Sequence, residues 1–492
     1  MFADKSIIAY NQSMLEKNKN IVFYLVLILI LICGVALRIL FYSYARPFWN
    51  DEAALAINLT DRSFLELFLP LSHEQVTPPL YAVLCKLIGD FIPLPELAFR
   101  LPALILGIGS IPLFFLLSKK LLQNPLGIVL ANTLFALNYQ LIYYSQELKQ
   151  YSCDVFCFLA ILLAYFYIDF DKPDKKQLLL ISIICAFSVW FSYTSVFAIF
   201  ILFILALIKN KKTCLYIAPA PTVSSVALGV LVLKYASDTN LHSFWQDGFI
   251  AKNFSNFFNL IFNNMLFYFP DLSWKLVVVL MFFAGMIYLF KTFKTDKSLI
   301  LLLPIVLAIA LSYFNIYPLY TRTALYLLPI VFLVMSKVFD IEKFDKNFIG
   351  AFGALLVVVF AYSSFKTDFK QVIQKKYYRE TTPQLLSLFQ KLEQSSDILV
   401  IPHLSAINYE YYSRDFKIDS KKVIVMRYEL YEYEKIKTVF DMLPSGYTYK
   451  ILVTHSGDKN LELENLEKYA QMQKDYSIVS DDYDNALLSF KK

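Results

Sequence analysis

The chain has 492 residues, of which 58% are hydrophobic and 17% are charged. Its mean hydropathy of +0.52 is far above that of soluble globular proteins, so we expect an integral membrane protein and not a soluble enzyme. The lysines behind the net charge of +6 fall in short connectors between apolar runs, where they determine topology and do not form a nucleic-acid surface.

Apolar runs of about 16 to 22 residues recur along the first three quarters of the chain, and each suffices to cross a hydrocarbon core of roughly 30 Å as a helix. The first run lacks a small-residue cleavage site, so we expect a retained anchor and not a cleaved signal. We predict about eleven spanning helices, near residues 21–41, 98–118, 126–142, 153–169, 178–193, 194–209, 214–234, 274–291, 298–314, 319–338 and 347–364.

Basic connectors orient these predicted helices. In this scheme the basic connectors fall on one side of the membrane, which the positive-inside rule makes the cytoplasm. The apolar stretch 78–91 would invert every later loop if it crossed the membrane, so we predict a helix at the outer interface there. The N-terminus is then cytoplasmic, and the outer face receives residues 42–97, 143–152, 235–273, 315–318 and everything after about residue 366.

The composition changes at Lys366, after which charges are frequent and no run is long enough to span a membrane. The stretches DILVIPHL, KKVIVMRY, YKILVTHS and YSIVSDD are typical of strands, and TPQLLSLFQKLEQ and NLELENLEKYAQM are typical of helices. We therefore predict a membrane domain, 1–365, with a catalytic first external loop, 42–97, and a small extracytoplasmic α/β domain, 366–492. The cysteines show no CxxC pair and imply neither zinc nor a disulfide framework.

Three external segments hold ionisable residues at positions where apolar residues would cost less free energy to place near the membrane. RPFWNDEAALA contains Asp51 and Glu52, YYSQELKQY contains Glu147 and Lys149, and YPLYTRTALYLLP places Arg322 about one turn inside a predicted helix. An ionisable group at membrane depth is by default a functional-site hypothesis. A carboxylate acting as general base, beside cations that neutralise a leaving phosphate, is the set needed to transfer a sugar from a phosphate-linked donor.

Each segment also has a structural interpretation. Asp51 and Glu52 suit the start of an interfacial helix, because acids stabilise the positive end of the helix dipole. Lys149 suits a side chain that extends to the membrane interface. The structural interpretation of Arg322 is a role in determining topology. However, Arg322 falls on the outer side, where the positive-inside preference does not place a cation. His73 and the other histidines show no metal-ligand spacing.

The ordered motifs FWNDEAALA, TPPLYAVLCKLIG, ELAFRLPALILGIGSIPLFFLLSKKLL and YYSQELKQYSCDV resemble the protein mannosyltransferase and lipid A aminoarabinose transferase group of C-type glycosyltransferases. The resemblance covers residues 20–340 and is densest over 46–160. It implies a multispanning helical fold with an acidic first external loop and an external C-terminal domain. It also implies inverting transfer of a monosaccharide from a polyprenyl-phosphate donor to a lipid A, glycan or protein acceptor at the outer face of a bacterial inner membrane.

This resemblance makes Asp51 the catalytic carboxylate, Glu52 its motif partner and Glu147 a further functional acid. The candidates for binding the donor phosphate are the cations Arg100, Lys149 and Arg322. Aromatic rings suit both sugar stacking and interface anchoring. The aromatic candidates for substrate binding are Trp49, Tyr81 and Tyr151.

The chain departs from the family pattern at three positions. Thr77 precedes PPLY where relatives often have His or Lys, and Thr323 follows Arg322 where Tyr is usual. Lys149 stands where Arg is commoner, which keeps the charge and loses the bidentate grip on phosphate.

Two other functions stay open from the sequence. A transporter or flippase of a lipid-linked glycan would use the same charges along a translocation path, although the sequence shows no inverted repeat. A noncatalytic scaffold would tolerate loss of Asp51. Whether a divalent cation such as Mg²⁺ or Mn²⁺ assists is equally open, because sequence spacing does not say whether Asp51 and Glu147 approach within coordination distance.

Overall fold

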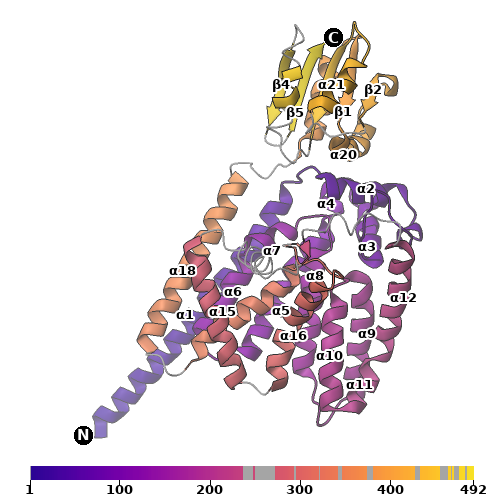
Figure 1. Cartoon of the computed structure of the whole chain (residues 1–492). Coiled ribbons are helices and arrows are strands. Elements are labelled where there is room, and N and C mark those ends of the chain that lie inside the picture. Colours follow the sequence, from indigo (N-terminus) through magenta and orange to yellow (C-terminus); the bar gives the residue numbers. More distant parts are fainter. Residues whose placement is uncertain are drawn as a thin grey trace. The chain divides into compact units, whose positions relative to one another are not determined.

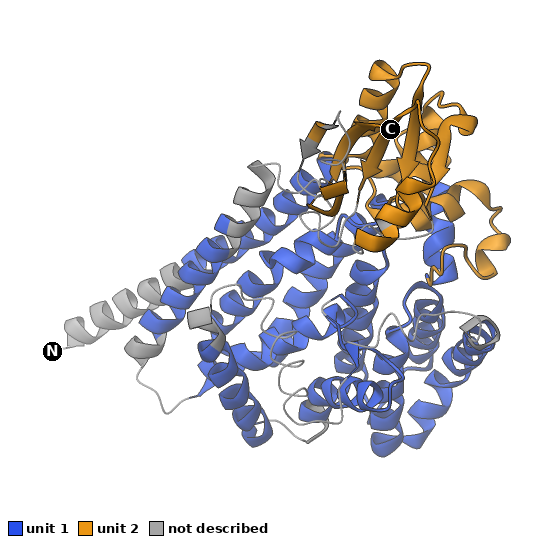
Figure 2. Ribbon diagram, turned by 45° about the horizontal axis from the view of Figure 1, so that its top comes forward, with its two compact units in different colours: residues 1–43, 77–87, 100–369 blue, residues 44–76, 88–99, 370–492 orange. Residues whose placement is uncertain are grey.

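The computed structural model divides the chain into two units, coloured blue and orange in Figure 2. Unit 1 comprises residues 1–43, 77–87 and 100–369, and unit 2 comprises residues 44–76, 88–99 and 370–492. The division of the chain into a membrane domain, 1–365, and an extracytoplasmic domain, 366–492, stays a prediction. The residues that the structure describes are 2–236, 248–249, 272–292, 295–320, 322–341, 346–373, 380–426, 433–454, 464–466, 468–469, 476–482 and 485–492.

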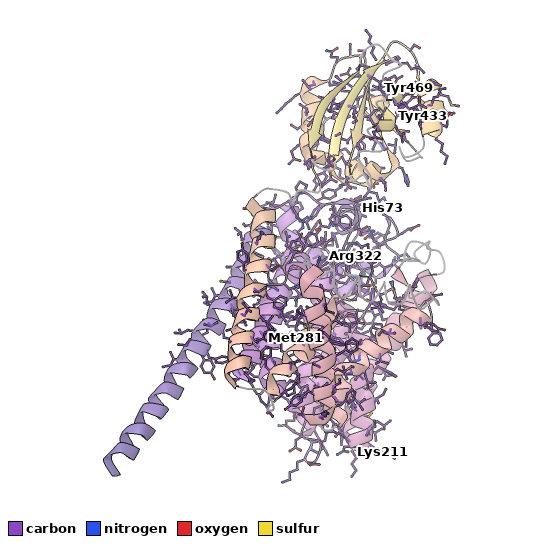
Figure 3. The ribbon with its side chains drawn as sticks, turned by 60° about the vertical axis from the view of Figure 1, so that its left-hand side comes forward. His73, Lys211, Met281, Arg322, Tyr433 and Tyr469 are labelled. Carbon is purple, nitrogen blue, oxygen red and sulfur yellow. The ribbon has the colours of Figure 1, made fainter. Side chains whose placement is uncertain are left out.

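The regular secondary structure in the described residues of unit 1 is helical (Figure 1). Its α-helices are α1 (Phe2–Ser43), α3 (Pro79–Gly89, which ends in unit 2), α5 (Leu101–Leu121), α6 (Pro125–Ala136), α7 (Tyr139–Tyr144), α8 (Tyr151–Tyr167), α9 (Lys175–Phe191), α10 (Ser195–Lys209), α11 (Lys211–Ile217), α12 (Pro219–Ala236), α15 (Leu272–Thr292), α16 (Thr295–Tyr313), α17 (Leu328–Ser336) and α18 (Lys346–Ile373). Two 3-10 helices, η3 (Leu325–Leu327) and η4 (Lys337–Asp340), flank α17. Met281 of α15 lies inside this bundle (Figure 3).

Two helices among the described residues are long and apolar enough to cross a membrane, Ile21–Ser43 and Pro95–Leu121. The pair α11 and α12 passes the same test together, with a bend of 49° at the break, and makes a third span if it is counted as one. The shorter apolar helices of 10–17 residues fall below the roughly 20 residues that a straight span requires. The predicted number of about eleven spans is therefore not confirmed.

One predicted span, 126–142, is interrupted in its last third. The helix α6 ends at Ala136, and Asn138 begins α7 by accepting the N–H groups of Gln140 at 3.1 Å and Leu141 at 3.2 Å. An Asn side chain competes with the helix for backbone hydrogen bonds and favours an N-cap position. The apolar pattern continued through this break, so periodicity alone did not reveal it.

The prediction of one continuous helix over 319–338 is wrong. The Thr323 hydroxyl accepts the Tyr320 N–H at 3.0 Å and donates to the Pro318 carbonyl at 2.6 Å, which closes a turn. Regular α-helix begins only at Leu328, after the 3-10 helix η3. A hydroxyl that satisfies local backbone groups offers the chain this alternative to a helix.

Close approach of two backbones fixes α1 against α6 within unit 1. A Cβ atom on Gly34 would lie 2.7 Å from the Ala136 carbonyl oxygen, so only glycine fits this crossing. The buried Arg38 donates from Nη1 to the Gly34 carbonyl at 2.9 Å and to the Ala136 carbonyl at 2.7 Å. The small residue permits contact, and the guanidinium satisfies a carbonyl at the end of α6.

We expect Gly34→Leu to lower the free energy of unfolding by about 1–3 kcal/mol, because the new side chain must displace α6. Cys33→Leu is the matched control, since the neighbouring Cys33 is exposed on the same helix. Chemical unfolding of both variants in detergent micelles measures the difference. Equal stability of the two variants would contradict the close α1–α6 contact.

Unit 2 combines helices with one five-stranded sheet. Its α-helices are α2 (Asn50–Asp61), α4 (Pro95–Ala98), α19 (Thr382–Leu392), α20 (Ala406–Tyr412) and α21 (Tyr433–Asp441). Its 3-10 helices are η1 (Glu66–Phe68), η5 (His403–Ser405), η6 (Ser413–Asp415) and η7 (Ser420–Lys422). Its strands are β1 (Asp397–Ile401), β2 (Val423–Val425), β3 (Thr448–Val453), β4 (Tyr476–Asp482) and β5 (Asn485–Lys491).

The strand order of the sheet is β2–β1–β3–β5–β4. The strand β1 runs parallel to β2 and β3, with Val400 paired to Ile424 and Ile451, whereas β5 runs antiparallel to β3 and β4. Parallel neighbours need helical crossovers, and α20 and α21 supply them. The helix α20 follows β1 after the short 3-10 helix η5. Its contacts with α2 are described below.

The sheet contains the four predicted strands and a fifth strand, β5, that was not predicted. The strand β5 is buried along most of its length, as β1 and β3 are. Its Phe490 ring stacks on Tyr449 with centroids 5.5 Å apart, and the buried Tyr469 packs against the same ring (Figure 3). The predicted helix NLELENLEKYAQM lies largely outside the described residues.

Candidate active site

The predicted acid pair forms the first turn of α2 in unit 2. The Trp49 carbonyl accepts the N–H groups of Glu52 at 2.8 Å and Ala53 at 2.9 Å, which starts the helix. Asp51 and Glu52 then face the positive end of the helix dipole, as their structural interpretation predicted. Residues 53–59 are buried, so the helix that carries the acids is fixed along its length.

Asp51 and Glu52 have different surroundings. Glu52 is completely buried, and its Oε2 lies 3.1 Å from Arg46 Nη1 and accepts the Trp49 N–H at 3.4 Å. Arg46 is itself buried, whereas Asp51 is only half-buried. The two adjacent carboxylates are thus separated into one that is enclosed with a guanidinium and one that keeps exposed surface.

The loop after α2 is tied back to that helix. Asn58 donates to the Ser72 carbonyl at 3.2 Å and accepts the Ser72 N–H at 2.8 Å. His73 follows in a left-handed backbone conformation, with φ at 57°, and its Nε2 lies 3.4 Å from Glu410 Oε2. This histidine contacts an acid of the C-terminal part of unit 2.

Glu147 and Lys149 lie in the short segment between α7 and α8 of unit 1, and both are buried. Tyr81 of α3 is completely buried and donates from its hydroxyl to the Lys149 carbonyl at 2.9 Å. The Ser152 hydroxyl donates to the Tyr144 carbonyl at 2.9 Å. Lys149 is 6% exposed, so most of this residue is enclosed by the protein.

Several predicted site residues surround Tyr144 at the end of α7. Its ring lies 5.1 Å from that of Tyr151, measured between centroids. Burial raises the pKa of Tyr144 well above its usual range, the Glu147 carboxylate raises this pKa further, and the Arg322 guanidinium opposes the shift. Glu147, Tyr151 and Arg322 therefore share one neighbourhood in unit 1, although they come from three segments.

Arg322 lies in the turn closed by Thr323 and not inside a helix, which corrects its predicted placement. Arg322 and Lys211 lie near opposite ends of the helices of unit 1 (Figure 3). Arg100 occupies the position before α5 and is 2% exposed. Its guanidinium interacts electrostatically with Tyr42 of α1.

The predicted site residues are divided between the two units. Unit 2 holds Trp49, Asp51 and Glu52, and unit 1 holds Tyr81, Arg100, Glu147, Lys149, Tyr151 and Arg322.

Asp154, a buried acid in the first turn of α8, was not among the predicted site residues. Its Oδ1 accepts the Ser192 hydroxyl at 2.6 Å, and this serine lies 3.1 Å from the Thr194 hydroxyl. The signal was present in the sequence, because a single carboxylate in the apolar stretch YSCDVFCFLA is expensive at membrane depth.

Metal binding receives no direct support from the described residues. Within them, no group of three or more His, Cys, Asp or Glu side chains lies together in a way that could hold a metal ion.

The chain has the fold of a C-type membrane glycosyltransferase. The structure of ArnT from Cupriavidus metallidurans in the apo state superimposes with a TM-score of 0.54 at 9% sequence identity, covering 96% of this chain and 98% of that one. The structure of the same protein bound to undecaprenyl phosphate gives a TM-score of 0.51 with the same identity and coverage. ArnT is a lipid A aminoarabinose transferase, so the resemblance predicted from the motifs is confirmed at the level of the fold.

A second similar structure is the Archaeoglobus fulgidus oligosaccharyltransferase in complex with Zn and sulfate, with a TM-score of 0.47 and 14% identity over 79% of this chain and 61% of that one. No family model and no curated protein sequence matches the chain.

Proposed function

We propose that the chain is a glycosyltransferase of a bacterial inner membrane that moves a monosaccharide from a polyprenyl-phosphate donor to an acceptor on the outer face. The observation that carries the proposal is the acid pair of α2, in which Glu52 is enclosed with Arg46 while Asp51 keeps exposed surface. The fold shared with ArnT supports the reaction class, and the undecaprenyl phosphate bound to ArnT supports the donor class.

Asp51 is the general base of the proposed reaction. It takes the proton from an acceptor hydroxyl, and the resulting oxygen forms a bond to the anomeric carbon of the donor sugar. The bond from that carbon to the phosphate oxygen breaks, and polyprenyl phosphate leaves with the electron pair. Attack from the face opposite to the leaving group inverts the anomeric centre.

Three cations of unit 1 offset the charge that develops on the leaving phosphate. Arg100, Lys149 and Arg322 serve this function, and the guanidinium groups suit a bidentate contact with phosphate oxygens. Glu147 acts together with Arg322 on the charge balance around Tyr144. Trp49, next to the acid pair, and Tyr151 provide aromatic faces for the sugar.

Tyr81 has a positioning role in this proposal, because its hydroxyl is bound to the Lys149 carbonyl. The acceptor is a lipid A, a glycan or a protein. The N-terminus lies in the cytoplasm and the sheet of unit 2 outside the membrane. The location of Lys211 and Arg322 near opposite ends of the unit 1 helices (Figure 3) supports this orientation, because the positive-inside rule places the Lys211 connector on the cytoplasmic side.

The full chain reconstituted in vesicles tests the proposal. The donors are undecaprenyl-phosphate-linked pentoses, aminopentoses and hexoses with a radiolabelled sugar, and the acceptors are lipid A and a glycolipid extract. We expect label to leave at least one donor and to appear in an acceptor. Label that crosses the bilayer while still attached to polyprenyl phosphate, with no transfer, would show a transporter instead.

A further inference from the structure

A helix from the C-terminal part of unit 2 holds the backbone just before the acid pair. Asn408 of α20 donates from Nδ2 to the Phe48 carbonyl at 3.0 Å. One turn further along α20, the Tyr412 hydroxyl accepts the Phe48 N–H. All three residues are buried, and Phe48 precedes Asp51 by only three positions. Both hydrogen-bonding groups of one backbone residue are therefore bound by side chains of a single helix.

The Phe48 ring is held as well as its backbone. It stacks on Phe99 with centroids 6.2 Å apart and meets Tyr411 edge-on at 5.5 Å. The Tyr412 hydroxyl also lies 3.3 Å from Glu96 Oε1. With the ring enclosed and the backbone bound, Phe48 cannot rotate without breaking several contacts, so it fixes the direction in which the chain enters α2.

The same C-terminal segment also contacts the far end of α2 and the loop that follows. Arg414 binds Asp61, the last residue of α2, through two parallel bonds of 2.6 Å and 2.9 Å. Glu410 lies 3.4 Å from His73. We call the four residues Asn408, Glu410, Tyr412 and Arg414 the α20 clamp. They contact the backbone just before α2, the last residue of α2 and the loop that follows it.

We propose that the α20 clamp positions Asp51 for sugar transfer, so that the C-terminal sheet domain is a working part of the active site; this rests on the proposed function. A general base must be held within about 0.5 Å of its productive position, and a misplacement of about 1 Å costs roughly 100-fold in rate. A helix of 12 residues is marginal by itself in water, so its buried packing and the contacts at its two ends together decide its position. The clamp residues touch α2 and its flanks and need not touch substrate.

The decisive comparison is between Tyr412→Phe and Tyr409→Phe. The first removes the hydroxyl that binds Phe48 and keeps the ring. The second removes a hydroxyl from the same helix whose hydrogen bond goes to Ser413 and not to the α2 segment. We expect Tyr412→Phe to lower kcat about tenfold with the donor KM unchanged, because donor contacts are kept and only the base is displaced. Tyr409→Phe should match the wild type.

Hydrogen exchange of the full-length protein in detergent gives a readout that is independent of activity. Amides of residues 46–56 should exchange faster in Tyr412→Phe than in Tyr409→Phe, while the amides of β1 and β3 keep wild-type protection and show that the sheet is folded. Unchanged exchange in residues 46–56 would overturn the clamp. Faster exchange with an unchanged kcat would overturn its role in positioning Asp51.

A charge swap at the far end of α2 provides a second test. Asp61→Arg and Arg414→Asp should each lower kcat, and the double variant should recover most of the loss, because the ion pair is restored with its signs exchanged. A double variant no better than either single variant would overturn the contribution of Arg414. If the wild type transfers no sugar from any donor, the proposed function fails, and the exchange data alone then decide whether α20 holds α2.

Discussion

Asp51→Asn is expected to lower sugar transfer by about 100-fold to 10,000-fold while donor binding persists. The amide keeps the size of the carboxylate and its place in the first turn of α2, but it cannot take the proton from an acceptor hydroxyl. Donor binding depends on the phosphate and the lipid chain, which the substitution leaves alone. Single-turnover transfer in vesicles, together with equilibrium binding of undecaprenyl phosphate, separates the two steps.

Glu74→Gln is the matched control for this loss. Glu74 is an exposed carboxylate in the loop after α2, and its neutralisation changes the local charge as Asp51→Asn does. Transfer by this variant should equal that of the wild type. If both variants lose activity to the same extent, the loop needs negative charge in general, and Asp51 is not the base.

The sequence predicted the fold better than it predicted the spans. The resemblance depended on ordered motifs, and these identified the fold even though the aligned structures share only 9% of their residues with this chain. The spans were predicted from apolar periodicity, which does not register local hydrogen bonds. Asn138 and Thr323 each divert the backbone from a helix by binding neighbouring N–H groups, and the apolar pattern runs on regardless.

The α20 clamp was beyond prediction from one sequence. Its contacts join residues that are more than 300 positions apart, and no local pattern marks Tyr412 as a partner of Phe48. Glu52 illustrates the intermediate case. Its motif with Asp51 was visible, but only the structure separates the buried carboxylate from the half-buried one.

Glu52→Gln is expected to lower the free energy of unfolding by about 3–5 kcal/mol, because it leaves the Arg46 charge buried without the carboxylate that faces it. The amide oxygen of Gln still accepts the Trp49 N–H at the start of α2. The change in stability therefore measures the loss of the negative charge and not the loss of this hydrogen bond. Adding Arg46→Met should recover most of the stability, since replacing a buried ion pair by uncharged groups of similar size is often neutral. Chemical unfolding in detergent micelles measures all three proteins.

The activity of these variants then assigns the role of Glu52. If Glu52 acts only by holding the first turn of α2, transfer should fall with stability in Glu52→Gln and recover with it in the double variant. If transfer instead stays lost after stability is regained, Glu52 participates in the reaction itself, and the enclosed carboxylate must reach the substrate in a state where Arg46 has released it. The separation of the two acids would then describe the resting enzyme, with Asp51 and Glu52 both required when the donor is bound.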